Sequence, residues 1–466
     1  MKAITFLGAT TAYDTTYVMP DGRTYTAPYF PAALVRFFSV QTLLVFVTED
    51  ARRMHYDVLA ALARGCVEHV HPVDIPDGRD ENELWRIFQK VADAVEPGDE
   101  LLFDITHGFR SLPFLSFLAA AYLRTVKQVE LKAVLYGAYE AGDKSVKPAR
   151  APVFDLTRFV TLLDWLAAAQ SFTRFGDAGD LAGLLRDRQA TPVHLAAARG
   201  DRPAQEISGL LRGVAASVDG VATALRLVRP AEVMAEAAKL EAALDGAAQV
   251  LSGQAQPFVL IGDQVRQAYA SFGLDAREQA AHPERVLGIE RELVAWYVEH
   301  EQYGPAITLA REHVVSHAIA CLGWDLAADR RLAEDLLNAE VRLRAAKRAL
   351  PLDAACRARL EPAFSLWASL GDLRNDLAHV GKGRRSPRSP GAIIRAAREL
   401  PALMTALAAA NTVQVGRGQP PTGAEREPLH ARLRAASEVA SARAAGLSEA
   451  EIDALVETAR AEAQKP

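Results

Sequence analysis

The sequence predicts an α/β domain followed by a large all-helical region. Over roughly the first 150 residues, short apolar and β-branched segments alternate with amphipathic helical segments, which is typical of a mostly parallel sheet covered on both faces. From residue 154 onward the strand pattern disappears, and Ala, Leu, Arg and Glu recur at helical spacing. The chain has 466 residues, more than one hydrophobic core usually serves, so we expect several domains.

Strands and helices follow one another in a regular order in the N-terminal part. Strand-like segments are 3–7, 42–47, 67–75, 100–105 and 129–135. Helical segments between them are 31–38, 51–64, 81–95 and 112–124. This alternation predicts a Rossmann-like or flavodoxin-like sheet. We expect an α/β domain at 1–150, a helical connector at 151–283, a second helical domain at 284–412, and a Gly- and Pro-containing linker with a helical tail at 413–466.

Composition limits the possible functions. Half of the residues are hydrophobic and 24% are charged, as in soluble globular proteins, and no apolar stretch is long enough to cross a bilayer, so we expect a cytoplasmic protein. The net charge of −5 argues against general adhesion to nucleic acid, and any RNA contact must be local. Cys66, Cys321 and Cys356 lie far apart and fit no metal-ligand spacing. We therefore expect neither a metal nor a cofactor.

Small and polar residues follow four of the predicted strands, at the sheet edge where open parallel sheets bind ligands. The candidate ligand-binding residues are Gly8, Ala9, Thr10, Thr11, Thr48, Glu49, Asp104, Thr106, His107, Gly108, Arg110 and Tyr139. Small residues let backbone N–H groups approach a phosphate, hydroxyl groups donate to it, and aromatic rings stack on bases. The alternative interpretation is that these residues are the caps and turns that any α/β domain needs.

The loop after the fourth predicted strand favours an anion most strongly. Thr106, His107 and Arg110 combine a hydroxyl, an imidazole and a guanidinium within five residues at the start of a helix. The first strand is followed by neither a Walker loop nor G-x-G-x-x-G, which argues against a nucleoside triphosphate or a dinucleotide.

The same loop resembles a known family. Asp104-Ile105-Thr106-His107-Gly108 is similar to the D-x-T-H-G signature of a branch of CRISPR-associated Rossmann-fold proteins, whose N-terminal sensor is called the CARF domain. Segments 101–103, 109–113 and 154–159 look like that family too, and the resemblance covers most of the chain. It implies that two such domains pair about a two-fold axis and bind a cyclic oligoadenylate made by a type III CRISPR complex. We expect cyclic tetra-adenylate in preference to cyclic hexa-adenylate, and a homodimer or a larger oligomer.

A second motif lies in the helical region. Arg374-Asn375-Asp376-Leu377-Ala378-His379 fits R-x4-H, the motif of HEPN ribonucleases. The pattern also occurs at Arg64…His69, where a predicted helix leads into a strand, and at Arg277…His282, beside a proline in a predicted loop. The copy that begins at Arg374 is the one that has a helical context and an asparagine directly after the arginine.

The residue types of this motif suit metal-independent cleavage of RNA. The ribose 2′-OH attacks the adjacent phosphate, a step that calls for a group titrating near neutrality and a planar cation. His379 would be the acid or base, Arg374 would stabilise the charged transition state, and Asn375 would orient either one. By resemblance, the products are a 2′,3′-cyclic phosphate and a 5′-hydroxyl. The alternative is that Arg374 and Asp376 are surface charges and His379 a residue at a helix end, favoured there by the dipole.

Basic residues follow the motif, and other functions stay open. Lys382, Arg384 and Arg385 are candidates for binding RNA phosphates, or they form a solvated loop. Glu312, His313 and His317 are interpreted as structural. The sequence as a whole predicts a cyclic-oligoadenylate-activated endoribonuclease that cleaves single-stranded RNA. The alternatives are a ligand-responsive transcription regulator, and a sensor that degrades its own activator using Thr106 or His107.

Overall fold

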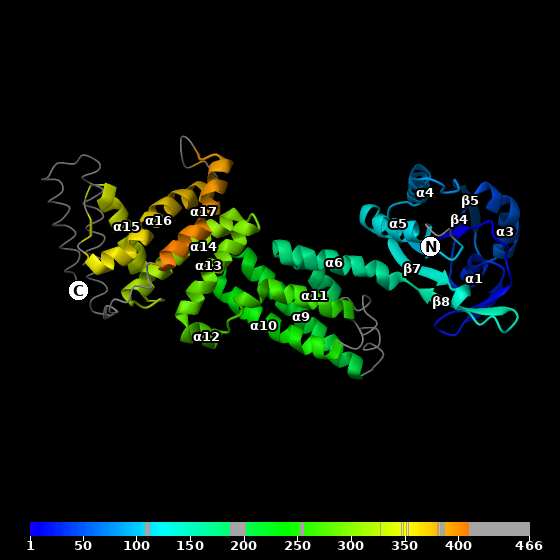
Figure 1. Cartoon of the computed structure of the whole chain (residues 1–466), viewed down its shortest axis with the longest axis horizontal. Helices are drawn as coiled ribbons and strands as arrows, with labels where there is room; N and C mark the ends of the chain where they lie inside the picture. Colours follow the sequence, from blue (N-terminus) through cyan, green and yellow to red (C-terminus); the bar gives the residue numbers. More distant parts are fainter. Residues whose placement is uncertain are drawn as a thin grey trace. The chain divides into compact units, whose positions relative to one another are not determined.

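The computed structural model describes residues 1–107, 112–186, 202–251, 256–326, 328–345, 347, 349–350, 352, 354–379, 382 and 387–409. The chain divides into two compact units, Met1–Ala167 and a second that begins at Ala168. Figure 1 labels their helices and strands. The predicted fold class, a parallel-dominated sheet followed by a helical region, is confirmed.

Five parallel strands form the centre of the first unit. They are β1 (Lys2–Leu7), β4 (Thr42–Val47), β5 (His69–Asp74), β6 (Glu100–Asp104) and β7 (Glu130–Gly137). Their spatial order is β7-β6-β1-β4-β5, and each neighbouring pair is parallel. This is the Rossmann order, in which successive crossovers lead away from β1 in both directions. The switch point between β1 and β6 is where such a sheet opens a crevice at its carboxyl edge.

Three further strands were not predicted. β8 (Ala149–Asp155) pairs antiparallel with β7, β2 (Thr15–Val18) is parallel to β8, and β3 (Thr24–Ala27) closes the sheet as its edge. Because β8 belongs to the sheet, the first unit extends to Ala167 and includes the first part of α6 (Thr157–Phe175). A domain end at 150 would cut through β8.

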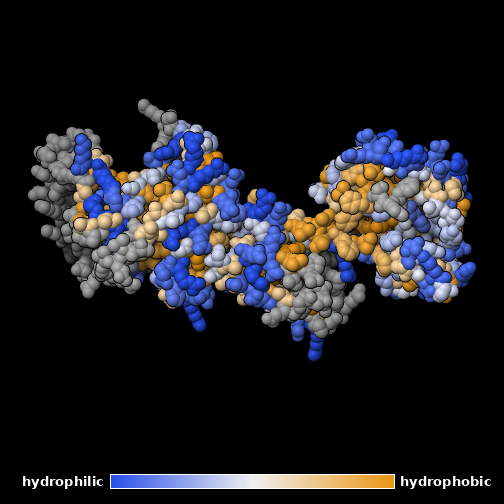
Figure 2. Space-filling view, viewed as in Figure 1, coloured by the Kyte–Doolittle hydropathy of each residue, from blue (hydrophilic) through white to orange (hydrophobic). Residues whose placement is uncertain are grey.

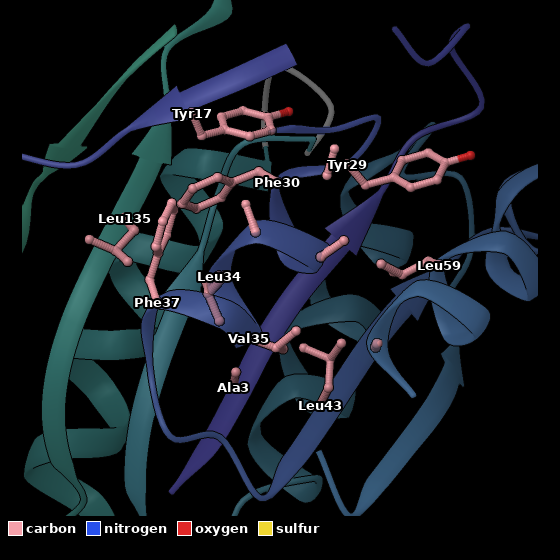
Figure 3. Close-up of a cluster of buried hydrophobic side chains, with 14 of the residues drawn as sticks. Ala3, Tyr17, Tyr29, Phe30, Leu34, Val35, Phe37, Leu43, Leu59 and Leu135 are labelled. Atoms are coloured by element: carbon pink, nitrogen blue, oxygen red, sulfur yellow. The ribbon is translucent and has the colours of Figure 1, made fainter. Parts of the chain in front are cut away.

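The sheet buries both faces. Along β1, Ala3 and Leu7 join one hydrophobic cluster, while Ile4 and Phe6 join the cluster on the opposite face. The first cluster, shown in Figure 3, lies beneath α1 (Phe30–Phe37), η1 (Arg52–Tyr56) and α3 (Asp57–Ala63). The second lies beneath α4 (Glu81–Asp93) and α5 (Leu112–Val126). Successive side chains of a strand point to opposite faces, so these strands must be apolar nearly throughout.

One predicted helix is interrupted. The segment 51–64 consists of a short α2 (Glu49–Ala51), the π-helical turn η1 and then α3. Within η1 the side chain of His55 is buried, whereas Arg53 and Met54 are exposed. A π-turn holds one residue more than an α-turn and is often found at functional sites.

The second unit is helical throughout its described ranges. Beyond α6 it contains α7 (Gly179–Arg186), α9 (Arg202–Arg226), α10 (Pro230–Leu251), α11 (Gln256–Tyr269), η3 (Ala270–Phe272), α12 (Ala276–Ala281), α13 (Pro283–Glu299), α14 (Tyr303–Leu322), α15 (Arg330–Ala345), α16 (Ala354–Ala378) and α17 (Pro390–Ala409). The predicted tail at 413–466 lies outside the part of the chain that the structure describes. Within the described ranges, every helix is too short or too polar to cross a membrane.

Candidate functional site

A pocket of about 330 Å³ opens at the carboxyl edge of the sheet, beside the switch point between β1 and β6. That volume is within the range of small-ligand sites, about 300–1,000 Å³. Its walls come from β1 and the segment after it, from the ends of β6 and β7, and from the β2–β3 hairpin region. The lining residues are Leu7, Gly8, Thr10, Thr11, Ala12, Tyr13, Thr15, Tyr17, Pro28, Tyr29, Thr106, His107, Tyr136, Gly137, Tyr139 and Glu140.

A buried hydrogen-bond network fixes the floor of the pocket. Asp104 is fully buried at the end of β6, where its Oδ2 accepts a bond from the Thr5 hydroxyl at 2.6 Å and its Oδ1 accepts from the Thr106 N–H at 2.8 Å. The Thr106 Oγ1 in turn accepts from the N–H of Gly137 on β7 at 2.8 Å. Burial raises the pKa of Asp104 to about 6. Three neighbouring strands are thereby held together around Thr106.

His107 is fixed from the α1 side. Its Nε2 lies 3.1 Å from the backbone N–H of Phe30, which can only donate, so Nε2 accepts and the ring proton of the neutral imidazole sits on Nδ1. Burial, followed by the nearby His55, lowers the pKa of His107 to about 4. His107 is therefore neutral near pH 7. Gly8 allows the first loop to approach, because a Cβ there would stand 3.1 Å from the His107 carbonyl oxygen.

Tyrosines form much of the pocket wall. They are Tyr13, Tyr17, Tyr29, Tyr136 and Tyr139. The Tyr29 hydroxyl lies 2.9 Å from His55 Nδ1, and His55 Nε2 is buried without a hydrogen-bond partner among the described residues. Figure 3 shows the rings of Tyr17 and Tyr29 at the border of the hydrophobic cluster. Aromatic rings and hydroxyl groups in one pocket suit a ligand that has both bases and phosphates.

The structure separates the predicted ligand-binding residues into groups. Gly8, Thr10, Thr11, Thr106, His107 and Tyr139 line the pocket, and Asp104 lies in the network that holds Thr106. Ala9 stands between two lining residues and is not one itself. Thr48 and Glu49 do not line the pocket: Thr48 is the N-cap of α2, accepting from the N–H of Ala51 at 3.4 Å, and Glu49 is exposed. Gly108 and Arg110 lie outside the described residues.

The sequence did not identify most of the tyrosines as pocket residues. Tyr13 precedes β2, Tyr17 lies on β2, and Tyr29 directly precedes α1. No strand was predicted in this stretch. A tyrosine-rich stretch directly after the first strand was the available signal, since Tyr is uncommon in ordinary connecting loops.

The second candidate group lies at the end of α16. Arg374 and Asn375 are exposed in its last turns, and an Arg374 Nη1 donates to the Asn375 Oδ1 at 3.3 Å. His379 follows the helix directly, and its backbone N–H donates to the Asn375 carbonyl at 3.0 Å, which continues the helical bonding pattern. All three side chains are thus accessible at the same end of the helix.

Residues around this group are placed as follows. Asp376 points inward, and its Oδ2 accepts from the Arg388 N–H at 3.1 Å. Lys382 is exposed, and its N–H bonds to the His379 carbonyl at 2.8 Å. Arg384 and Arg385 lie outside the described residues.

The other two R-x4-H copies differ from this one in separate ways. Arg64 ends α3 and His69 begins β5, whereas His282 separates α12 from α13. In the Arg277 copy the histidine also follows its helix directly, and the His282 N–H donates to the Glu278 carbonyl at 2.8 Å. That copy differs in having Glu278 at the position of Asn375, and its His282 Nδ1 lies 3.2 Å from a Glu284 oxygen.

The residues Glu312, His313 and His317 belong to two different environments. His313 is buried, with Nδ1 2.8 Å from Glu290 Oε2, and His317 Nε2 is 3.3 Å from the Cys321 sulfur. Glu312 instead forms ion pairs with Arg311 and Arg330. Among the described residues, no three His, Cys, Asp or Glu side chains are arranged to hold a metal ion.

Two comparisons with known proteins agree on the class of the first unit. Residues 2–140 match the family model described as CRISPR system endoribonuclease Csx1, CARF domain. One relative is the CRISPR-associated protein MJ1674 of Methanocaldococcus jannaschii, which is 32% identical to this chain over 113 residues. That stretch covers 24% of this chain and 17% of the relative. Both findings support a CRISPR-associated protein with a CARF domain, as the sequence predicted, and both concern the N-terminal part.

The depressed pKa of His107 predicts how stability depends on pH. In the unfolded chain His107 has an ordinary pKa of about 6.5, so between pH 6.5 and 4 the unfolded state binds more protons and the native state loses stability as pH falls. His107→Gln keeps an acceptor for the Phe30 N–H but cannot titrate. We expect the variant to lack this part of the acid destabilisation, on the order of 1–3 kcal/mol.

Urea unfolding of both proteins from pH 7 to pH 4.5 measures the effect. Asp104 titrates in both proteins, so its contribution cancels in the difference. Parallel pH profiles for the wild type and the variant would contradict the prediction.

Proposed function

We propose that this protein is an endoribonuclease of type III CRISPR defence, activated by a cyclic oligoadenylate and independent of metal ions. The observation that carries the proposal is the pocket at the switch point of the sheet, within the stretch that matches the Csx1 CARF model. Its tyrosine rings offer stacking surfaces for adenine. The hydroxyl groups of Thr10, Thr11 and Thr106 offer donors for phosphate oxygens.

The activator we propose is cyclic tetra-adenylate, in preference to cyclic hexa-adenylate. A cyclic oligoadenylate repeats the same unit around a ring, so its symmetry suits two equal pockets related by a two-fold axis. Neutral His107, with its proton on Nδ1, can donate to a phosphate without bringing a charge that would have to be desolvated. Binding therefore depends on hydrogen bonds and stacking more than on charge.

An apolar surface on the first unit supports pairing of two copies. On α5, Phe114, Leu118, Tyr122 and Val126 are exposed at every fourth position and form one stripe. On α6, Phe159, Leu163 and Leu166 are exposed as well, and the Arg124–Asp164 ion pair of 2.7 Å ties the two helices together. Figure 2 shows hydrophobic colour over this region. We call these seven residues the α5–α6 face.

The size and chemistry of the α5–α6 face favour a second copy as its partner. Phe114, Tyr122 and Phe159 are 73%, 43% and 61% exposed. At about 150–250 Å² for a full aromatic side chain, these three leave on the order of 350 Å² of ring surface in water. The aliphatic residues add to this, and patches of that size mark interaction sites. An uncharged face is complementary to itself, as a two-fold interface requires.

In the helical unit, we propose that His379 exchanges protons with the ribose 2′-OH or the leaving oxygen. Arg374 would stabilise the negative charge on the phosphate, and the Asn375 side chain, 3.3 Å from the Arg374 guanidinium, would hold that group in place. Each chain supplies one such imidazole for two proton transfers. Two copies of the motif facing each other would supply both the acid and the base.

The central experiment incubates the protein with labelled single-stranded RNA in EDTA, with cyclic tetra-adenylate, cyclic hexa-adenylate or neither. We expect cleavage with the tetra-adenylate, with 2′,3′-cyclic phosphate ends. Arg374→Ala and His379→Ala should each lower the rate at least a hundredfold, because each removes a group that acts in the transition state. Both should still bind the activator, measured by calorimetry. Activity above a tenth of wild type in both variants, or a need for divalent ions, would refute the mechanism.

The activator site and the cleavage site should separate in titrations. Thr106→Ala, His107→Ala and Arg110→Ala should raise the activator concentration needed for half-maximal cleavage without lowering the maximal rate. Besides the hydrogen bonds that Thr106 and His107 make within the fold, these side chains would contact the activator and not the RNA, a coupling of about 1–3 kcal/mol. Thr48→Ala is the matched control, because Thr48 caps α2 and does not line the pocket. A lowered plateau with an unchanged midpoint would place the three residues in the switch or in catalysis instead.

The α5–α6 face should be needed for dimer formation. Phe114→Asp combined with Leu118→Asp would bury two charges in the proposed interface, and we expect a monomer by light scattering together with loss of RNA cleavage. Val58→Asp is the control, since Val58 is 49% exposed on α3, which covers the opposite face of the sheet. A double variant that stays dimeric would remove this face from the interface.

A second activity of the sensor is favoured by one contact. The Tyr29 hydroxyl at the pocket wall bonds to His55, which pairs a phenol with a base where a phosphodiester could bind. We propose that the sensor slowly opens its own activator. Mass spectrometry of the cyclic tetra-adenylate should then detect linear products, at a rate lowered at least tenfold by His55→Ala. An intact ring after many RNA turnovers would exclude this activity.

A further inference from the structure

Arg311 on α14 is an arginine held firmly near the motif of α16. Its guanidinium carbon lies 4.2 Å from the centre of the Trp367 ring, and its side chain is only 20% exposed. Trp367 is itself fixed, because its ring N–H donates to the Asn338 Oδ1 at 2.9 Å. Two carboxylates complete the setting: Glu312 Oε1 at 2.8 Å and Glu334 Oε2 at 3.9 Å. Stacking and pairing together leave Arg311 little freedom.

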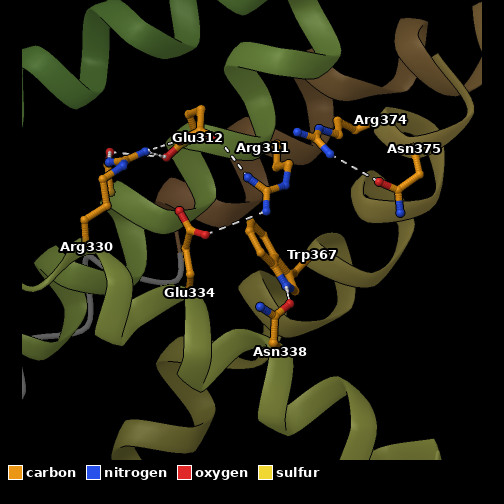
Figure 4. A network of polar contacts seen from close by, with 9 residues as sticks. Arg311, Glu312, Arg330, Glu334, Asn338, Trp367, Arg374 and Asn375 are labelled. Carbon is orange, nitrogen blue, oxygen red and sulfur yellow. Dashed lines mark hydrogen bonds and ion pairs between the residues drawn. The ribbon is translucent and has the colours of Figure 1, made fainter. Parts of the chain in front are cut away.

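Arg374 lies on the same stripe of α16 as Trp367. The two residues are seven positions apart, which is two helical turns, and long side chains on a helix lean toward its N-terminus. The Arg374 side chain is thereby directed back toward Trp367 and the arginine stacked on it. Figure 4 shows the Arg374 guanidinium extending toward Arg311. α14 and α16 are packed against each other along this seam.

The carboxylates around this seam have partners other than Arg374. Glu312 and Glu334 pair with Arg311 and Arg330. Asp372 lies 3.7 Å from the Arg388 guanidinium, and Asp376 accepts from the Arg388 N–H. Glu312 is shared between Arg311 and Arg330. Among the described residues, the partner of the exposed Arg374 guanidinium is the neutral Asn375 side chain and not a carboxylate. Arg374 therefore has no carboxylate partner among the described residues, and it lies on the same helix seam as Arg311. Two guanidinium groups along one seam favour an anion.

We propose that Arg311 is a second RNA-binding cation of the helical site and contacts a backbone phosphate beside the one that Arg374 contacts. Trp367 and Glu334 hold it in position, so little side-chain entropy is lost on binding. The inference rests on the proposed function, because it takes single-stranded RNA as the ligand. It adds a residue that the R-x4-H motif does not contain and that lies 63 positions before Arg374 in the sequence.

The test measures binding apart from cleavage. A labelled RNA with 2′-O-methyl groups cannot supply the attacking 2′-OH, so its affinity can be followed by fluorescence anisotropy over a series of salt concentrations. Arg311→Gln removes the charge but keeps a polar side chain that can lie on Trp367, and Arg311→Lys keeps the charge. Arg285→Ala is the matched control, because Arg285 is a half-exposed arginine in an ion pair on α13.

We expect Arg311→Gln to weaken binding about tenfold, as for the loss of one hydrogen bond to a charged group. The slope of log affinity against log salt should fall in magnitude by about 0.7, the value for one phosphate contact on a single strand. Arg311→Lys should keep the slope, and Arg285→Ala should change neither quantity. With cleavable RNA, Arg311→Gln should raise KM more than it lowers kcat, whereas Arg374→Ala lowers kcat.

Two results would overturn the proposal: a wild-type protein that does not bind the RNA, or an unchanged slope in Arg311→Gln, including the case in which Arg311→Gln and Arg311→Lys lose equal affinity. The last pattern would give Arg311 a purely structural role. If Arg311→Gln failed to fold, Glu334→Gln would decide, because it removes a carboxylate that competes with a phosphate for Arg311. RNA binding should then tighten and the slope should not fall in magnitude, and weaker binding would count against the proposal. A protein that binds this RNA but cleaves none would refute the proposed function and still leave Arg311 open to this measurement.

Discussion

The sheet of the first unit must bury both of its faces, and most of that unit's architecture follows from this constraint. Strands with apolar side chains on both sides need helices above and below, and the crossovers that supply them make neighbouring strands parallel. Both faces are then closed to ligands, so the carboxyl edge is the place where polar groups can gather. The order of the strands opens a crevice at that edge between β1 and β6, where Thr106 and Gly8 line the pocket.

The strength of this constraint explains which parts of the fold could be predicted. The five central strands and four covering helices have strong patterns, because burial acts on every residue of a strand or on a whole helical face. The strands that were missed, β2, β3 and β8, lie toward or at one edge of the sheet and are partly exposed. They contain polar residues, and β8 also contains a proline, Pro152. Their pairing depends on contacts with distant strands, which a local pattern does not record.

The candidate sites divide in the same way. Thr106, His107 and Gly8 could be predicted because they follow strands directly, and Arg374 with His379 because a helix sets their spacing. Thr48 shows the limit of that reasoning, since a threonine after a strand is equally suited to capping a helix. Tyr29 and Arg311 are placed at their sites by tertiary packing alone. The Tyr29 hydroxyl contacts His55 of η1, and the Arg311 guanidinium stacks on Trp367 of the neighbouring helix.

The π-turn of η1 has a consequence for how this fold can vary. A π-turn differs from an α-turn by one residue, so the loss of a single residue there would restore a regular helix without touching the contacts of Leu59 and Ala63 on α3. The same loss would rotate the position of His55 by about 100° and take the imidazole away from Tyr29. The number of residues in this one turn thus decides whether the pocket has the Tyr29–His55 pair, while the shape of the pocket stays nearly the same.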